Sequence, residues 1–306
     1  ANTDRDSYYG PGNDPLKAYG KTTDLTAMGG AQYVHTFDKC FFMPSDLTAG
    51  LEYNRDRLKD NMWGYDRHTD QTVNIYSAFL QNEWKNDRWG ILIGGRLDKH
   101  NMVDNVIFSP RANLRFNPTQ NINLRLSYSS GFRAPQAFDE DMHIENVGGT
   151  VAMIERAKNL KEEKSQSFSA SADMYHRFGV FQTNFLIEGF YTRLTDVFVL
   201  GEPYDRGDGI LVKTRSNGPG AKVMGLTLEG KVAYLSILQI QAGLTLQRSR
   251  YDEPHKWHDD APAEKKIFRT PDTYGYFTAT YTPIKPLSIA LSGTYTGRML
   301  VQRMDI

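Results

Sequence analysis

The chain has 306 residues, and its 36 lysine and arginine residues balance 36 aspartate and glutamate residues, so the net charge is zero. This balance excludes the strongly basic footprint of a nucleic-acid-binding protein and an acidic tail. No apolar run approaches the ~18 residues that a transmembrane helix needs, and the single Cys40 excludes an internal disulfide and a cysteine-rich metal site. Aromatic residues make up 12% of the chain and glycine is plentiful, which is typical of a β-rich protein.

Apolar and polar residues alternate along nearly the whole chain, which is the pattern of strands with two different faces. The clearest strands are expected at 47–53, 89–97, 111–116, 122–128, 167–174, 226–234, 238–246 and 287–295, and weaker ones at 25–37, 73–84, 180–192, 211–216 and 274–282. One face is expected to carry Leu51, Ile93, Leu126, Ala172 and Leu244, and the other Glu52, Arg96, Arg125, Asp173 and Gln247. Helical periodicity is missing throughout, although 153–164 could hold one helical turn.

The connections between the expected strands alternate between short and long. Short ones lie at 85–88, 117–121, 176–179, 235–237 and 283–286, and long ones at 54–71, 99–109, 131–165, 201–211 and 248–272. Successive strands of an antiparallel meander turn at alternate ends, so all short turns should fall at one end and all long loops at the other. An outer-membrane β-barrel has this asymmetry, with short periplasmic turns, long external loops, a lipid-facing apolar surface and a polar lumen. A soluble sheet with one solvated face is the alternative.

Several short segments follow one another in the order found in a known family. They are GGRLD at 94–98, SPR at 109–111, FRAP at 132–135, NLKEE at 159–163, YTRLTD at 191–196 and SNGPGAKVMGLTLE at 216–229. Together they resemble the barrel of TonB-dependent outer-membrane receptors, in the style of receptors from the Bacteroidetes group. The resemblance covers about 76–234 and implies an all-β, antiparallel transmembrane β-barrel.

The resemblance also implies parts that the chain does not show. Family members carry an N-terminal plug domain and close a barrel of about 22 strands, whereas about 13 strands are expected here. The pattern also stops in the middle, after YTGRMLVQRMDI at 295–306. We therefore expect residues 1–306 to be a single barrel segment, truncated at both ends, with the plug domain absent from this chain.

The function implied by the resemblance is import of a scarce, bulky nutrient across the outer membrane of a Gram-negative bacterium. Ferric siderophores, haem and corrinoids are the expected ligands, and the TonB energy-coupling complex would drive uptake through a plug outside this chain. Membrane lipid and a surface lipoprotein are further expected partners, with no nucleic acid and no resident cofactor or metal. The alternative is a passive porin-like or adhesin-type barrel. No Ser, His and Asp set stands out as that of a barrel hydrolase, so we expect no enzyme activity.

The long loops carry the candidate ligand-binding residues. Arg125 and Arg133 are expected at the outer mouth of one strand, where they would meet an anionic ligand, and Asp139 and His143 follow in the 131–165 loop. In haem receptors of the family a histidine follows the Phe-Arg-Ala-Pro element, so the resemblance allows His143 to ligate haem iron. The alternative is that Arg133 pairs with lumen carboxylates and that His143 is a solvated loop residue.

Aromatic residues in two further loops could form platforms for large, flat or anionic ligands. Trp63, Tyr65 and His68, together with Arg67, lie in the 54–71 loop, and Trp257 lies in the 248–272 loop. Sugars and peptides fit such surfaces almost as well. The nearby His255 and His258 lack the i, i+4 spacing of a zinc protease site.

Overall fold

A computed structural model describes residues 1–8, 19–63, 67–136, 145–147, 150–207, 211–256 and 262–301. Within these ranges no helix is long and apolar enough to cross a membrane. The strands are β1 (Asn2–Tyr8), β2 (Tyr19–Cys40), β3 (Met43–Met62), β4 (Arg67–Lys85), β5 (Trp89–His100), β6 (Ile107–Thr119), β7 (Ile122–Arg133), β8 (Glu145–Val147), β9 (Thr150–Arg156), β10 (Glu163–Phe178), β11 (Phe181–Thr195), β12 (Phe198–Leu200), β13 (Tyr204–Asp205), β14 (Leu211–Asn217), β15 (Ala221–Tyr234), β16 (Leu238–His255), β17 (Glu264–Lys266), β18 (Thr273–Ile284) and β19 (Leu287–Thr296).

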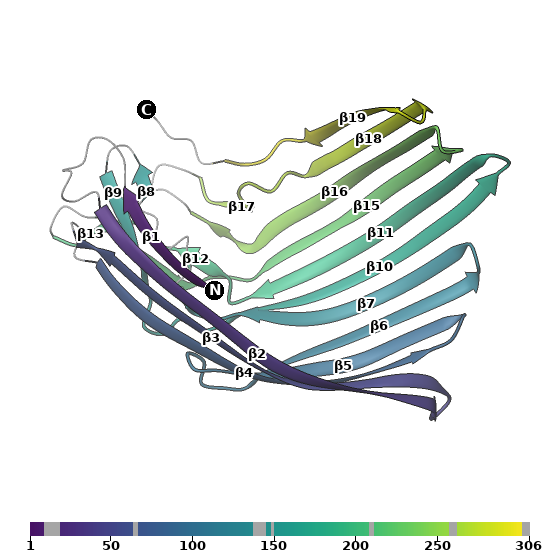
Figure 1. The fold of residues 1–306 in the computed structure, drawn as a ribbon. Coiled ribbons are helices and arrows are strands. Elements are labelled where there is room, and N and C mark those ends of the chain that lie inside the picture. Colours follow the sequence, from purple (N-terminus) through teal and green to yellow (C-terminus); the bar gives the residue numbers. More distant parts are fainter. Residues whose placement is uncertain are drawn as a thin grey trace.

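Most strands form one curved antiparallel wall (Figure 1). Its order is β1-β2-β3-β4-β5-β6-β7-β10-β11-β15-β16-β18-β19, with β17 paired to β16. Apart from the two insertions that follow β7 and β11 and the short β17, each strand lies beside its neighbour in sequence. The predicted all-β meander is confirmed, as are the short turns: β4–β5, β6–β7, β10–β11, β15–β16 and β18–β19 all turn at the same end, on the right of Figure 1.

The strand register assigns each side chain to a face, because cross-strand partners in an antiparallel pair project to the same side. One row runs Ala172–Ile187–Leu228–Leu244 across β10, β11, β15 and β16. Followed from strand to strand, the same face also carries Leu51, Ile93 and Leu126. The opposite face carries the five polar residues expected there: Glu52, Arg96, Arg125, Asp173 and Gln247. Both sets of face assignments are confirmed.

The outer face exposes many large apolar side chains, which would be unfavourable in water. Leu51 is 66% exposed and Leu126 54%. Aromatic pairs border this surface at both heights, as in the girdles of membrane barrels. Trp89–Phe116 and Phe181–Tyr234 lie towards the short turns, and Tyr53–Tyr76 and Tyr128–Phe168 lie towards the loops, with ring centroids 4.2 to 5.0 Å apart. This surface therefore fits a lipid environment.

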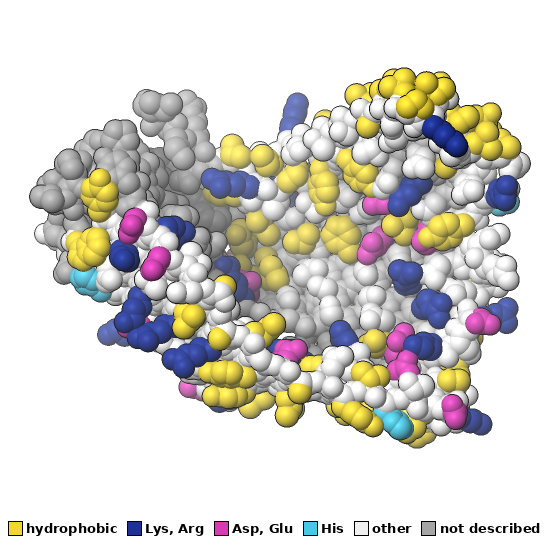
Figure 2. Space-filling view, in the orientation of Figure 1, with side chains coloured by type: hydrophobic (Ala, Val, Ile, Leu, Met, Phe, Trp, Pro, Cys, Tyr) yellow, Lys and Arg dark blue, Asp and Glu magenta, His cyan; other side chains and the backbone are white. Residues whose placement is uncertain are grey.

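The inner face carries charged groups that neutralise one another. Arg96 bridges Glu52 at 2.6 Å and Asp98 at 2.8 Å, and Ser77 donates a hydrogen bond to Asp98 at 2.6 Å. In Figure 2 the hollow of the wall is lined by charged and uncharged polar side chains with scattered apolar ones, while apolar side chains gather along the lower rim, where the outer surface comes into view. The two faces thus differ as a lumen and a lipid surface should.

The structure contains a second, small sheet that the sequence analysis did not predict. It has the order β12-β14-β9-β8, with β13 paired to β14, and we call it the cap sheet. The segment 211–216, expected in the wall, is β14 of this sheet, and the start of 153–164 is strand β9 rather than a helical turn. The expected loop 54–71 is also largely strand, because β3 continues to Met62 and β4 begins at Arg67. The expected loop 248–272 is strand in part, because β16 continues to His255 and β17 covers Glu264–Lys266. Strand β1 was not predicted.

Candidate functional site

The cap sheet is fixed against the inner side of the wall at its loop end. Arg156 of β9 donates a hydrogen bond to the side-chain carbonyl of Gln71, a residue of the inner face of β4, at 2.9 Å. The backbone N–H of Phe198 in β12 donates to the carboxylate of Glu163 in β10, also at 2.9 Å. Since Gln71 is only 8% exposed, the cap sheet and the loops cover this part of the lumen face.

Two insertions far apart in the sequence build the cap sheet together. Strand β9 comes from the β7–β10 connection and β14 from the β11–β15 connection, and they pair in parallel from Leu211–Ala152 to Arg215–Arg156. Asn217 closes the joint by donating to the carbonyls of Lys161 and Asp196 at 3.1 and 2.8 Å. The pairing therefore gives the inserted loops a defined position over the wall.

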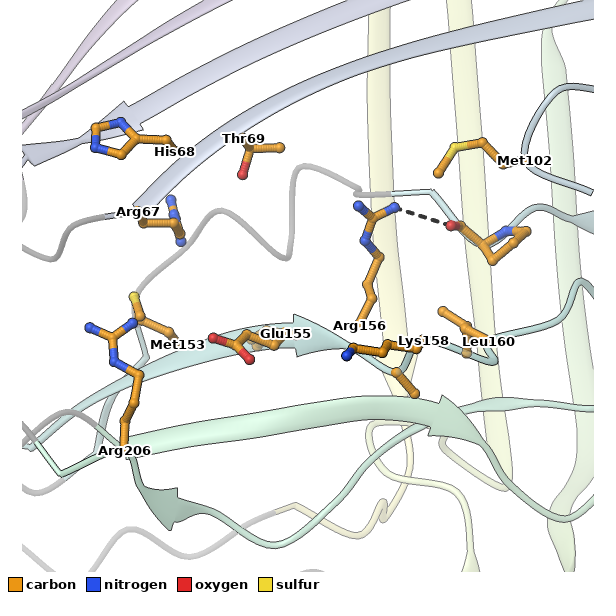
Figure 3. A pocket seen from close by; sticks show the side chains of 13 residues that line it. Arg67, His68, Thr69, Met102, Met153, Glu155, Arg156, Lys158, Leu160 and Arg206 are labelled. Carbon is orange, nitrogen blue, oxygen red and sulfur yellow. Dashed lines mark hydrogen bonds between the residues drawn. The ribbon is translucent and has the colours of Figure 1, made fainter.

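A cleft of ≈ 590 Å³ lies between the cap sheet and the wall (Figure 3). This volume is within the ~300–1,000 Å³ range of small-molecule sites. The wall side contributes Arg67, His68 and Thr69 of β4, Met102 of the β5–β6 loop and Pro135 just after β7, and the cap side contributes Met153, Ile154, Glu155, Arg156, Ala157, Lys158, Leu160 and Arg206. Figure 3 shows Arg156 reaching from the cap towards the wall, where it donates to the Pro135 carbonyl at 3.1 Å.

Positive charge dominates the lining of this cleft. Its lining contains four cations, Arg67, Arg156, Lys158 and Arg206, and one carboxylate, that of Glu155. Arg67 also bridges Asp60 at 2.8 Å, with both side chains largely buried, and Thr22 donates to the same carboxylate at 2.7 Å. No ion pair joins Lys158 to another described residue. The lining therefore favours an anionic ligand over a neutral or cationic one.

A buried histidine holds the β5–β6 loop beside the cleft. His100, the last residue of β5 and beyond the apolar band, is fully buried, and its Nδ1 accepts a hydrogen bond from the backbone N–H of Met102 at 3.0 Å. Its Nε2 lies 3.3 Å from the side-chain oxygen of Gln136. Burial lowers the pKa of His100, more than the Gln136 contact and the Asp98 charge raise it. The imidazole is therefore neutral at neutral pH, with its proton on Nε2.

The structure does not bring all the predicted site residues together in one site. His68 lines the cleft, where its Nδ1 lies 3.0 Å from the side-chain oxygen of Asn61. Trp63, just after β3, is 57% exposed. Arg133 sits between wall and cap, with its guanidinium carbon 5.5 Å from the ring centroid of Phe198. Tyr65, Asp139, His143 and Trp257 lie outside the described residues.

Arg125 does not lie at the outer mouth, so this part of the prediction is wrong. It is near the start of β7, beside the short turn, whereas Arg133 ends the same strand at the loop side. At ~3.3 Å per residue the two lie roughly 26 Å apart along the strand. Arg125 instead donates a hydrogen bond to Asn123 at 2.7 Å.

Sequence reasoning missed Arg156, Lys158 and Arg206 as cleft residues. All three lie in long connections at the loop end, and this location is the only feature of the sequence that could have indicated a role in ligand binding. Within the described part of the chain, no group of three His, Cys, Asp or Glu side chains is arranged to hold a metal ion. The described lining of the cleft offers a ligand mainly cationic and apolar side chains.

Replacing Arg133 tests the contact between β7 of the wall and β12 of the cap sheet. An Arg133→Ala change removes a cation–π contact to Phe198, a contribution of about 0.5–2 kcal/mol that helps to hold β12 against the wall. We expect faster proteolysis within 196–217 and a smaller loss of ligand affinity than cleft variants give. Arg133→Lys, which keeps the charge, should restore most of the protection, and unchanged cleavage in Arg133→Ala would show that the contact does not hold the cap.

The polar-lumen wall and the inserted cap are matched by one family model. The model for the TonB dependent receptor-like β-barrel matches residues 1–302. This chain belongs to that family. No curated protein matches it in sequence.

Solved receptors share the fold at low sequence identity. The siderophore receptor PirA from Pseudomonas aeruginosa superimposes with a TM-score of 0.68 at 17% identity, over 90% of this chain and 49% of that one. A mutant of the ferric enterobactin receptor PfeA from Pseudomonas aeruginosa gives 0.69 at 18%, over 97% and 45%. The FrpB iron transporter from Neisseria meningitidis gives 0.64 at 15%, over 91% and 43%. The chain thus spans less than half the length of these receptors.

Proposed function

We propose that this chain forms part of the wall and the cap of an outer-membrane receptor that imports a ferric siderophore. The observation that carries the proposal is the cation-lined cleft on the lumen side of the loop end. A ligand arriving from outside would meet this charge first, and an anionic iron chelate is the complementary chemistry. The solved proteins with the same fold, which include siderophore receptors, support this choice over haem or a corrinoid.

The described residues would bind the chelate without changing it. Arg156 and Lys158 from the cap and Arg67 from the wall would contact its anionic oxygens. Because Arg156 is hydrogen-bonded to both Gln71 and Pro135, its guanidinium is held in place before the ligand arrives, which lowers the entropic cost of binding. Met102, Met153 and Leu160 provide apolar contacts for the organic part of the chelate.

Transport would be active and would depend on the TonB complex, acting through a plug outside this chain. The test is uptake of radiolabelled iron by Gram-negative cells that produce the full-length receptor. We expect saturable uptake of a ferric siderophore that stops when an uncoupler collapses the proton gradient. Uptake that is unaffected by the uncoupler and rises linearly with concentration would instead establish a passive porin-like barrel.

Haem and a corrinoid serve as competing ligands in the same cells. We expect an excess of either to leave uptake of the siderophore unchanged. If haem competes fully and the siderophore does not bind, the proposed substrate class is wrong, although the transport function would stand.

A further inference from the structure

A second basic cluster lies on the outer surface of the wall, opposite the lumen. It comprises Arg193 of β11, Lys222 of β15, Arg248 and Arg250 of β16, and Lys265 of β17. We call these five residues the outer basic patch. Arg193, Lys222 and Arg250 are cross-strand partners in a single row, and the register places this row on the same face as Leu228 and Leu244.

The patch lies at the border of the apolar band. The row next to it runs Tyr191–Met224–Arg248, and the row after that Gly189–Leu226–Leu246. Successive rows towards the short turns therefore change from three cations to a mixed row that still contains Arg248, and then to a row with two leucines. A hollow of ≈ 340 Å³ at this height is lined by patch cations and by Met224, Tyr251 and Asp252.

The described protein compensates this charge only in part. Like charges directly opposite each other on neighbouring strands are destabilising. Asp252 is the acidic side chain within the hollow, and it lies 2.8 Å from Arg193 and 3.5 Å from Lys222. Lys265 donates to the carbonyl of Asp252, not to its carboxylate, at 2.7 Å. The Nε of Arg250 is buried and has no hydrogen-bond partner among the described residues.

We propose that the outer basic patch binds the phosphate groups of a lipid headgroup in the leaflet on the loop side. Arginine forks match phosphate oxygens in a bidentate geometry, and Lys222 supplies a further point charge. The acyl chains of the same lipid would lie along Met224, Leu226 and Leu246, directly below the patch. Only a lipid presents phosphate and hydrocarbon together at this height, and the site lies on the opposite face of the wall from the cleft.

The test is a lipid titration of the full-length receptor in nonionic detergent, followed by native mass spectrometry. The probe is bisphosphorylated lipid A, and the variant is Arg193→Gln, Lys222→Gln and Arg250→Gln combined. The matched control is Arg88→Gln, Arg177→Gln and Lys285→Gln, which removes three exposed cations from the short turns at the opposite end. We expect the patch variant to lose affinity on the order of 100-fold, and the control to bind as the unaltered receptor does.

Two further arms identify the source of the phosphate. Dephosphorylated lipid A should bind as weakly to the unaltered receptor as the phosphorylated lipid does to the patch variant. Inorganic phosphate, at the same phosphate concentration, should not displace the lipid. Three results would each overturn the proposal. They are displacement of the lipid by inorganic phosphate, a loss of lipid affinity in the control variant as large as that in the patch variant, and binding of lipid A by the patch variant as tight as that by the unaltered receptor. Siderophore affinity of the patch variant should be unchanged, which separates this inference from the proposed function.

Discussion

A Leu126→Arg variant is expected to lose most of its correctly folded receptor. Leu126 lies on the outer face of β7, between Leu114 of β6 and Ala170 of β10, and its side chain is 54% exposed to the surroundings of the wall. A cation at the midplane of a lipid-facing barrel surface costs about 2–4 kcal/mol. The measurement is the folded fraction on heat-modifiability gels after refolding of the full-length receptor into lipid vesicles.

The neighbouring position provides the matched control. Ser127 follows Leu126 in the same strand but projects to the lumen face, where its cross-strand partners are Asn113 and Ser169. Ser127→Arg should therefore refold nearly as well as the unaltered receptor. If both variants refold equally, the face assigned to lipid is wrong.

An Arg156→Ala variant is expected to bind an anionic ferric chelate much more weakly. It removes a charge-assisted contact of about 1.5–3 kcal/mol, which corresponds to roughly 10- to 150-fold in the dissociation constant. Part of this loss reflects the hydrogen bonds from Arg156 to Gln71 and Pro135, which position the cap. Lys158→Ala isolates the effect of charge, because Lys158 forms no ion pair with a described residue, and it should cause a smaller loss.

Arg125→Ala is the control for Arg156→Ala. It removes the same charge from the lumen face, but beside the short turns at the other end of the wall. We expect chelate affinity to change by less than about twofold, which is within the uncertainty of such measurements. Equal losses in Arg125→Ala and Arg156→Ala would show that the general charge of the lumen, not the cleft, binds the chelate.

Local periodicity was sufficient to predict the wall and its two faces. Arg125 and Leu126 are neighbours that project to opposite faces because side chains alternate strictly along a strand. The same rule failed above the apolar band. In 55–60, Arg55, Arg57 and Lys59 alternate with Asp56, Leu58 and Asp60, so both faces are mostly polar and the strand extension resembles a loop.

The cleft could not be predicted because it depends on non-local pairing. Ala152 and Leu211 meet in a parallel ladder between two insertions, and no local pattern specifies that register. The cations of the cleft thus come together only through the cap sheet. Sequence reasoning placed Arg133 at the loop end correctly, since it ends a strand. It misplaced Arg125, which lies eight residues earlier in the same strand and therefore beside the short turn.

The most direct test of the cleft is a titration of purified full-length receptor with two ferric chelates of similar size and different charge. One is an anionic ferric tris-catecholate and the other an uncharged ferric trihydroxamate, each followed by quenching of tryptophan fluorescence at low and at high salt. We predict saturable binding of the catecholate that weakens as salt rises, and at least roughly tenfold weaker binding of the hydroxamate. Equal affinity for both chelates, with no dependence on salt, would contradict the assignment of the cation-lined cleft as the ligand site.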